Sequence, residues 1–329
     1  MGRRVQPMKI IKAVRDLHQA SSVKYERLAA EVRDNLKPRA ESRGWFFLSR
    51  LKELESFALK IETGRVPDPR GMEDFYACTI VVPTILQIDD AEELIRFLYD
   101  FHERRPPDDL RTRKASSSFA FDDLRLYVKR RSLASGKDED LDGIVFEVQI
   151  KTILQYAWST ATHDLIYKTD TISWPRERIA YQVKAMLEHA EVAIAEANRL
   201  SDARAVAKKD DRTDNILRII DQVRHFWPED RLPDNIKRLA EIIFDLLRTC
   251  DLSANDLAPI LEAEKQRIGL IPTDLSPYAF VVQAMAHSKS IEFRDKFSRR
   301  HIRACIVIHG GMDLPTWMLD VHDRIVKLD

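Results

Sequence analysis

Apolar side chains in the first 105 residues alternate between helical and strand spacing. Runs with a repeat of three to four residues indicate amphipathic helices, and short runs of aromatic and β-branched residues indicate buried strands. The pattern predicts helix 7–34, strand 44–49, helix 51–64, strand 75–83 and helix 88–105. A polar stretch containing Pro38 is expected to end the first helix. This β–α–β–α order favours an α/β layer in which helices pack on a sheet.

Two more strands are predicted at 117–131 and 143–152, and the short polar loop between them indicates an antiparallel hairpin. The sheet is therefore expected to be mixed. Side chains alternate between faces along a strand, so the apolar residues of the second strand share one face and Glu147, Gln149 and Lys151 share the other. Such alternation is typical of a half-exposed strand with a solvated face, and by itself it indicates no function.

Helical spacing dominates the chain from residue 153 onward. A long helix is predicted at 175–209, with Pro175 suited to its first turn. The charged stretch 208–214 marks a domain boundary. The fold class is therefore predicted as α/β (α+β), in three parts: an N-terminal helix over 1–40, a mixed-sheet domain with its trailing helix over 41–210, and an all-α C-terminal domain over 211–329.

Composition bounds the class of protein without identifying it. Lys and Arg total 53 and Asp and Glu total 53, so the net charge says nothing about partners. The 9 glycines favour long helices over a loop-rich fold. The three cysteines are too few and too scattered for a disulfide framework or a cysteine zinc site. The sequence shows neither a signal peptide nor an apolar run that would span a bilayer, so we expect a cytoplasmic protein without membrane contact.

Cationic side chains gather at the junction of the first predicted strand and the helix after it. Lys52, Ser56 and Lys60 recur every four residues and form one stripe along that helix, with Arg50 just before it. Several cations and a hydroxyl near a helix start suit a polyphosphate, and an arginine can also stack on a base. Two neighbouring glutamates make an ordinary solvated helix face an equal alternative.

Two carboxylates belong to predicted strands of the same sheet. Asp74 directly precedes the core of strand 75–83, and Glu147 lies in strand 143–152. By itself Asp74 is most simply a turn residue, because Asp often caps turns. Combined with the cationic stripe, the two carboxylates would hold Mg²⁺ at a phosphate site, as phosphoryl-type transfer requires. No Walker A sequence or glycine-rich phosphate loop occurs, which disfavours a P-loop enzyme.

The segment after the second strand ends in a polar group of residues. His163 and Tyr167 lie four residues apart on one helix face, and Lys168 follows. A helix that packs back on the sheet would bring this end toward the polar face of the strand. A lone histidine is more often a structural hydrogen-bonding residue than a catalyst, so His163 alone indicates little.

The ordered set of motifs resembles the RelA/SpoT family of alarmone synthetases, and its small single-domain members in particular. The resemblance covers roughly residues 40–170, the usual size of one domain. Its motifs are R-L-K-x-x-x-S-x-x-x-K at Arg50–Lys60, E-D-F-Y-A around Asp74, E-V-Q-I-K-T at Glu147–Thr152 and H-D-L-I-Y-K at His163–Lys168. The resemblance implies a nucleotidyltransferase-like mixed sheet. It also implies transfer of the β,γ-pyrophosphate of ATP to a ribose 3′-hydroxyl, usually of GDP or GTP, to make (p)ppGpp.

The resemblance also implies a role for each motif residue. Four residues would bind ATP, the first by stacking on adenine and the others through the phosphates: Arg50, Lys52, Ser56 and Lys60. Asp74 and Glu147 would hold Mg²⁺, and Glu147 would also be the base for the acceptor hydroxyl. The remaining residues would shape and charge the cleft and its acceptor side: Phe121, Arg125, Gln149, Lys151, His163, Tyr167 and Lys168.

Three departures from the family pattern affect the acceptor side. Thr79 replaces the arginine of the family motif D-x-x-G-x-R. The acceptor loop G-Y-x-S-L-H aligns with A-F-D-D-L-R, which puts Phe121 where a tyrosine stacks on guanine and Arg125 where a histidine is expected. The basic residue that normally precedes this loop is missing. The two aspartates of the aligned loop would also repel a phosphorylated acceptor.

These departures leave three functions open. The first is a Mg²⁺-dependent pyrophosphokinase that makes (p)ppGpp. The second directs the same donor chemistry at another 3′-hydroxyl, such as the tRNA 3′ end or an adenine nucleotide, as in toxin relatives of the family. The third is a weakly catalytic nucleotide-binding regulatory protein, whose C-terminal helices bind a protein partner or form an oligomer. Only about 45 residues, roughly one or two helices, precede the first motif, so we expect no hydrolase domain there.

Overall fold

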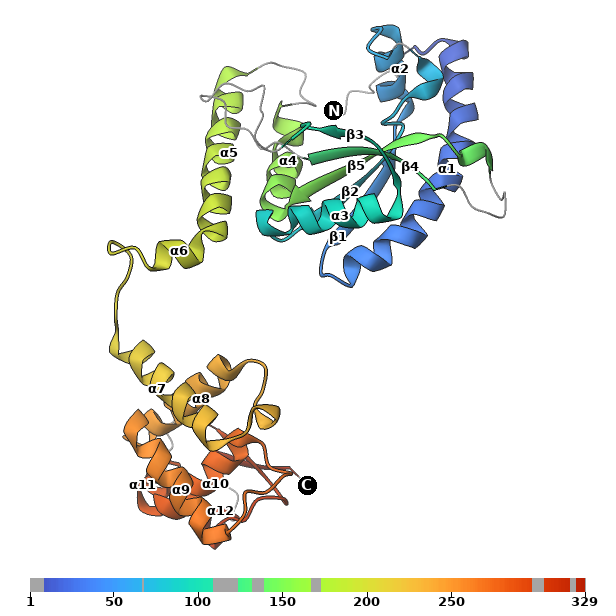
Figure 1. Cartoon of the computed structure of the whole chain (residues 1–329). Coiled ribbons are helices and arrows are strands. Elements are labelled where there is room, and N and C mark those ends of the chain that lie inside the picture. Colours follow the sequence, from blue (N-terminus) through green and yellow to red (C-terminus); the bar gives the residue numbers. More distant parts are fainter. Residues whose placement is uncertain are drawn as a thin grey trace, which may run out of the picture. The chain divides into compact units, whose positions relative to one another are not determined.

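The computed structural model describes residues 9–66, 68–108, 124–131, 139–166, 173–297, 305–319 and 324–328. The chain divides into two compact units, Met1–Val206 and Ala207–Asp329, and each has its own hydrophobic core. Figure 1 shows a sheet flanked by helices in the first unit and a mainly helical second unit. None of the described helices is long and apolar enough to cross a membrane.

One mixed sheet organises the first unit. Its strands are β1 (Phe46–Leu51), β2 (Tyr76–Val82), β3 (Asp100–Arg105), β4 (Leu124–Lys129) and β5 (Val145–Thr152). The order across the sheet is β1-β2-β5-β4-β3; β2 and β5 are parallel, and the other neighbours are antiparallel. The predictions of a mixed sheet and of an antiparallel β4–β5 pair are confirmed.

Alternation along the strands separates an apolar face from a polar face. The helices of this unit are α1 (Lys12–Glu41), α2 (Leu54–Glu62), α3 (Ile88–Leu98), α4 (Ile153–Ile166), α5 (Trp174–Ala195) and α6 (Ala197–Ser201). On β5, Phe146, Val148 and Ile150 are fully buried in the core that α1 and α3 help to form. Glu147 and Gln149 therefore lie on the opposite face, as the sequence predicts.

The helix predicted at 88–105 is two elements. After α3 the chain forms strand β3, which pairs with β4 at the edge of the sheet. Tyr99 between them has an extended backbone (φ −127°, ψ 157°), and its ring packs edge-on against Phe146 with 5.3 Å between ring centroids. Burial of this ring and strand pairing end the helix, and neither is visible in a helical repeat.

Two helix ends also differ from the predictions. Pro38 does not end α1 but lies inside it. A proline removes only one backbone donor, and the fully buried Leu36 and Ala40 hold this end of the helix against the core. The helix predicted at 175–209 is α5 and the short α6, divided at Glu196, whose backbone (φ −93°, ψ 10°) is not helical.

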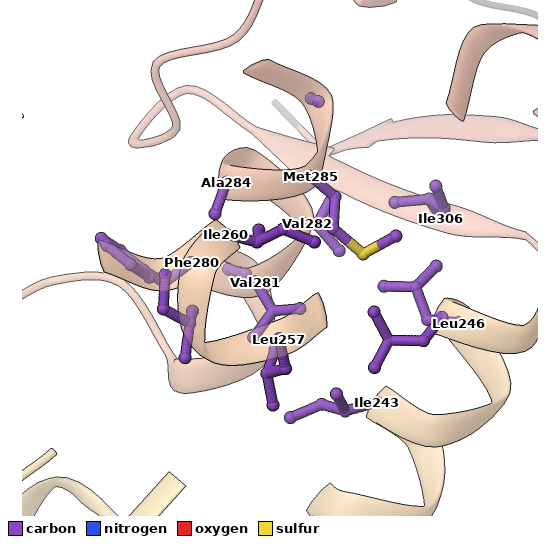
Figure 2. Close-up of a cluster of buried hydrophobic side chains, with 14 of the residues drawn as sticks. Ile243, Leu246, Leu257, Ile260, Phe280, Val281, Val282, Ala284, Met285 and Ile306 are labelled. Carbon is purple, nitrogen blue, oxygen red and sulfur yellow. The ribbon is translucent and has the colours of Figure 1, made fainter. Parts of the chain in front are cut away.

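Helices dominate the second unit, as predicted, and a small sheet accompanies them. The described helices are α7 (Asp211–Phe226), α8 (Ile236–Thr249), α9 (Leu257–Ile268), α10 (Pro277–Ser288), α11 (Ser290–Phe297) and α12 (Thr316–Leu319). Strands β6 (Ile306–His309) and β7 (Ile325–Leu328) form a parallel pair that was not predicted, because four residues are too few to show alternation. Figure 2 shows the core, where α8, α9 and α10 meet Ile306 of β6.

Candidate active site

Side chains from α2, the turn before β2 and strands β3, β4 and β5 line one cavity of about 550 Å³ in the first unit. Its charged lining includes Lys60, Asp74, Arg105, Arg125 and Glu147. These residues are far apart in the sequence, and the sheet order brings their strands together. The cavity opens on the polar face of the sheet.

Asp74 stands directly before β2 and accepts hydrogen bonds from two lysines. Lys52, directly after β1, donates from Nζ to Asp74 Oδ2 at 2.9 Å, and Lys60 in the last turn of α2 donates to the same oxygen. Because β1 and β2 are antiparallel, the end of β1 lies beside the start of β2, and this register brings Lys52 to Asp74. His18 Nε2 donates to the Lys52 carbonyl at 2.8 Å and ties this junction to α1.

Burial and the neighbouring charges shift the pKa values of Asp74 and Lys52. Burial acts to raise the pKa of Asp74, but the hydrogen bonds from Lys60 and Lys52 outweigh it and lower that pKa. For Lys52, burial is the largest influence and lowers the pKa in spite of the contact with Asp74. Two lysines therefore contact one carboxylate, which is ionised at neutral pH. Such an arrangement can exchange the carboxylate for phosphate oxygens.

Glu147 lies in β5, is only 4% exposed, and has both carboxylate oxygens engaged. The Tyr127 hydroxyl donates to Oε2 at 2.9 Å, and the Gln149 amide donates to Oε1. Tyr127 is directly opposite Glu147 on β4, and Gln149 is two residues farther along β5, so all three share one face. Burial, together with the charge of Glu147, raises the pKa of Tyr127, which keeps its hydroxyl a donor.

Arg105 at the end of β3 was not predicted as a site residue. Its guanidinium lies 4.2 Å from the centroid of the Tyr127 ring and donates to the Tyr127 hydroxyl at 3.1 Å. It also donates to Glu103 at 2.6 Å and to Glu73 at 3.4 Å. It was missed because the sequence analysis assigned residues 88–105 to a helix and not to a strand of the sheet. The available signal was a pair of arginines directly before two prolines.

One row across the sheet aligns Arg125 and Arg105 with Thr79. The register pairs Thr79 with Gln149, Gln149 with Arg125, and Arg125 with Arg105. Residues of one cross-strand row share a face, so both arginines stand on the same face as Thr79. Position 79 is where the family pattern has an arginine. Thr79 carries no charge, but Arg125 of β4 and Arg105 of β3 supply cationic charge in the same row, and both line the cavity.

The remaining predicted residues are distributed around this centre. Arg50 is exposed on β1 and belongs to the row that contains Glu147, through Ala77 of β2. Ser56 is exposed on α2 but does not line the cavity. Lys151 is half-buried on β5. Three predicted residues lie outside the described part of the chain: Phe121, Tyr167 and Lys168. The same holds for the side chain of His163.

The two carboxylates fit the role of a magnesium pair that shares its ion with a substrate. Asp74 and Glu147 line the same cavity, and Mg²⁺ prefers carboxylate oxygens. Both lysine bonds fall on Asp74 Oδ2, so neither uses Oδ1. No group of three or more His, Cys, Asp or Glu residues suited to a metal occurs in the described part of the chain.

The fold and the cavity define a phosphate-handling transferase domain: a mixed sheet that holds two carboxylates against cationic walls. Residues 49–172 match the family model described as the region found in RelA/SpoT proteins. All four sequence motifs lie within this segment. The chain therefore carries a domain of the RelA/SpoT family, and the predictions of this family and of a pyrophosphokinase are confirmed.

Several solved structures are similar to this chain. Small alarmone synthetase 1 from Bacillus subtilis is 18% identical, with a TM-score of 0.45 over 57% of this chain and 100% of that one. Small alarmone synthetase 2 from Bacillus subtilis is 13% identical, with a TM-score of 0.44 over 55% and 97%. A GTP pyrophosphokinase family protein from Streptococcus pneumoniae is 16% identical, with a TM-score of 0.39 over 59% and 96%. No curated protein matches the chain significantly.

Proposed function

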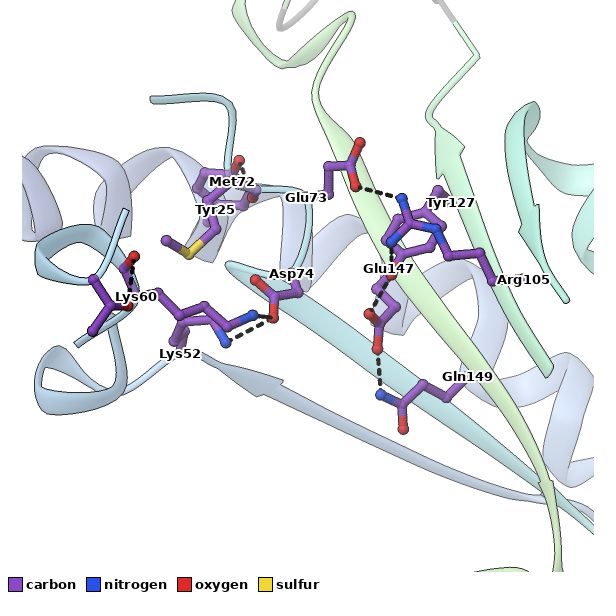
Figure 3. Close-up of polar contacts among 11 residues, drawn as sticks. Tyr25, Lys52, Lys60, Met72, Glu73, Asp74, Arg105, Tyr127, Glu147 and Gln149 are labelled. Carbon is purple, nitrogen blue, oxygen red and sulfur yellow. Dashed lines mark hydrogen bonds and ion pairs between the residues drawn. The ribbon is translucent and has the colours of Figure 1, made fainter. Parts of the chain in front are cut away.

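We propose that the first unit transfers the β,γ-pyrophosphate of ATP to the 3′-hydroxyl of GDP or GTP, with Mg²⁺, and so makes (p)ppGpp and releases AMP. The supporting observation is one cavity in which Asp74 and Glu147 stand between two cationic walls. In Figure 3 the lysines approach Asp74 from one side, and Glu147 and Arg105 lie on the other. Two substrates that both carry phosphates need such a divided site, because each brings its own negative charge.

ATP would occupy the side formed by the end of β1 and by α2. Lys52 and Lys60 would exchange Asp74 for the ATP phosphates, because ammonium groups form charge-assisted hydrogen bonds to either. Arg50 would stack on adenine and Ser56 would contact a phosphate, as the family motif implies. Both side chains are exposed and therefore accessible to a nucleotide.

Asp74 and Glu147 would hold Mg²⁺, which when bound neutralises charge on the phosphates of the transferred group. Glu147 would also accept the proton of the attacking 3′-hydroxyl. A carboxylate has about four lone-pair sites, so the bonds from Tyr127 and Gln149 leave capacity for this proton. These two bonds orient the carboxylate before the acceptor arrives.

The acceptor would occupy the side bounded by β3 and β4. Arg105 and Arg125 would bind its 5′ phosphates, since both line the cavity, Arg105 lies on the side away from the lysines, and Arg125 is paired with it across β3 and β4. Phe121 would stack on the base. The other motif residues would shape and charge this end of the cleft: Gln149, Lys151, His163, Tyr167 and Lys168.

A transfer assay tests the acceptor. The purified full chain is incubated with γ-³²P-ATP and Mg²⁺, and GDP, GTP, ADP, AMP or bulk tRNA is offered in turn. We expect label in GDP or GTP. Label in an adenine nucleotide or in tRNA would instead establish the second function, with the same donor chemistry. ATP binding without transfer to any acceptor would establish the third, a regulatory protein.

The catalytic carboxylate is tested with Glu147→Gln, which keeps the shape of the side chain and removes the base. General base catalysis contributes roughly 10²- to 10⁴-fold, so transfer should fall by at least about 100-fold while ATP still binds. Glu55→Gln is the matched control, because Glu55 is exposed on α2 near the site. Transfer that survives Glu147→Gln would overturn the role proposed for this residue.

A further inference from the structure

A short link, Lys52 and Glu53, connects strand β1 to helix α2. Glu53 stands at the N-cap position of α2, where a Ser, Thr, Asp or Asn side chain usually caps a helix, but it makes no such hydrogen bond. The link therefore has no side-chain cap to fix its conformation. Because Lys52 belongs to the link and Lys60 to α2, the positions of both lysines depend on what holds the link and the helix in place.

Helix α1 supplies a restraint on this link through His18. The His18 Nε2 donates to the Lys52 carbonyl at 2.8 Å, and the Lys52 N–H donates to the Phe75 carbonyl at 2.8 Å. The peptide groups on both sides of Lys52 are therefore held. The bond to Phe75 continues the pairing of β1 with β2, whereas the bond from His18 comes from a helix 34 residues earlier in the chain.

The His18 ring also packs against two phenylalanines that are fully buried. Its centroid lies 5.3 Å from that of Phe57 in α2 and 5.2 Å from that of Phe75, which directly follows Asp74. The two phenylalanine rings contact each other edge-on, with 5.5 Å between their centroids. These three rings hold α2 against the start of β2. They therefore also fix the position of Lys60, which lies three residues after Phe57 on α2.

Tyr25 of α1 holds the turn that carries Asp74. Tyr25 follows His18 by about two helical turns, so both side chains lie on one face of α1. The Tyr25 hydroxyl donates to the Met72 carbonyl at 3.3 Å, and its ring lies 4.6 Å from the Phe75 ring. Burial, with the nearby charge of Asp74, raises the pKa of Tyr25 to about 12, so the hydroxyl remains a donor. Figure 3 shows Tyr25 beside Met72, on the lysine side of the site.

Both side chains come from outside the segment that matches the family. The match covers residues 49–172, whereas α1 spans Lys12–Glu41. Apart from Tyr25, the buried residues of α1 are apolar: Val14, Leu28, Ala29, Val32, Leu36 and Ala40. Apolar side chains would be sufficient to pack this helix on the sheet. His18 and Tyr25 add hydrogen-bond donors, and both donors reach backbone carbonyls at or next to the site residues.

We propose that His18 and Tyr25 are positioning residues of the donor site. Through them α1 holds the Lys52 carbonyl and the turn before Asp74, so that both lysines and this carboxylate are in place before ATP arrives. The identity of the donor as ATP rests on the proposed function. Neither residue is among the described residues that line the cavity, so each acts through its neighbours. Loss of either bond should therefore weaken ATP binding and leave the acceptor side, formed by β3 and β4, unchanged.

Calorimetric titration of the full chain with Mg²⁺ and ATP, without an acceptor, tests the role of His18. His18→Phe keeps an aromatic ring against Phe57 and Phe75 but removes the donor. The dissociation constant for ATP should rise about 5- to 30-fold, the effect of leaving a buried carbonyl without its donor. His18→Gln should restore most of the affinity, because its amide offers an N–H near the position of Nε2.

Steady-state kinetics separate positioning from a general loss of folding. His18→Phe should raise the KM for ATP and leave the KM for the acceptor unchanged, whereas a variant that is merely less folded would lower kcat and change neither KM. Tyr25→Phe removes a longer bond, so its KM for ATP should rise less, about 2- to 5-fold. His189→Phe, at an exposed position of α5, is the matched control and should behave like the native chain.

The outcomes distinguish this proposal from the proposed function. Unchanged ATP affinity in His18→Phe, with native transfer, overturns the positioning role and leaves the reaction standing. Affinity that falls in His18→Phe and recovers in His18→Gln supports the role even if the native chain transfers to no acceptor. A loss that His18→Gln does not restore would make His18 a packing residue, and a native chain that does not bind ATP overturns both proposals. If circular dichroism shows His18→Phe unfolded, His18→Met replaces it, because methionine fills irregular space and also lacks a donor.

Discussion

Side chains that contact Glu147 orient its carboxylate, which is the proposed general base. Tyr127 and Gln149 occupy its two oxygens, and Arg105 holds Tyr127 by a hydrogen bond and by lying over its ring. The orientation of a nearly buried carboxylate therefore depends on residues of three strands, β3, β4 and β5. Preorganised groups of this kind need not rearrange during the reaction.

Tyr127→Phe should lower kcat and leave the KM for ATP nearly unchanged. The change removes the hydroxyl that donates to Glu147, and a hydrogen bond to a charged group contributes roughly 1.5–3 kcal/mol, so kcat should fall about 10- to 100-fold. Tyr127 lies on the side away from the lysines, which is why ATP binding should persist. Steady-state kinetics measure both quantities. Tyr181→Phe, at an exposed position of α5, is the control, and an unchanged kcat in Tyr127→Phe would contradict the positioning role.

Contacts between elements hold the frame around the cavity. Arg130, just after β4, is 3% exposed and donates to Asp142 at 2.6 Å and to Glu31 of α1 at 2.8 Å. Arg27 of α1 makes a comparable contact to Asp140 at 2.8 Å, but the side chains of Arg27 and Asp140 are 44% and 52% exposed. Both contacts tie α1 to residues between β4 and β5, one buried and one exposed.

Arg130→Met should destabilise the fold far more than Arg27→Met. Removing one partner of a buried pair leaves uncompensated charge and costs about 3 kcal/mol, whereas an exposed pair contributes about 0–1 kcal/mol. Urea unfolding at neutral pH gives both values. Equal losses in the two variants would show that burial of Arg130 does not matter to the free energy of unfolding.

The junction of α4 and α5 should make stability depend on pH. Burial, with a contribution from Glu188, raises the pKa of Glu191 to about 7. The folded state then binds this proton more tightly than the unfolded state, so the stabilisation is complete below the ordinary pKa and is lost as pH rises through about 7. Relative to Glu191→Gln, the native chain should lose on the order of 2 kcal/mol of unfolding free energy between pH 5 and pH 8.

Urea titrations of both proteins at several pH values measure this difference. Glutamine keeps the oxygen that accepts from Thr152, so the variant retains that contact. Glu196→Gln, at an exposed position after α5, is the control and should follow the native chain. Parallel pH curves for the native chain and for Glu191→Gln would contradict the assignment.

Two separate cores organise the whole molecule. The core of the first unit draws on α1, α2, α3 and the sheet, and that of the second unit on α7 to α12 and the β6–β7 pair. We therefore expect the fragments 1–206 and 207–329 to fold separately, each with a cooperative transition. Pyrophosphate transfer should remain with fragment 1–206. An unfolded or inactive first fragment, beside an active full chain, would show that the second unit completes the catalytic domain.

Local sequence was informative where one residue pattern dominates its own element. The alternation of β5 placed Glu147 and Gln149 opposite its apolar residues. The four-residue spacing placed Lys52 and Lys60 along one helix, but Lys52 lies just before α2 and Lys60 is in its last turn, not at its start. The motifs around them were sufficient to identify the family. Local patterns were insufficient for β3 and for the β6–β7 pair, because a short edge strand or a four-residue strand exists only through its partner.

The sequence by itself determined the family, the mixed sheet and the chemical identity of the proposed donor site. It did so because these depend on residue types at short, regular spacing. The tertiary structure alone decided that both lysines bond to Asp74, and that Tyr127, itself held by Arg105, donates to Glu147. Those facts depend on strand order, register and helix rotation, which are set by contacts between residues far apart in the chain.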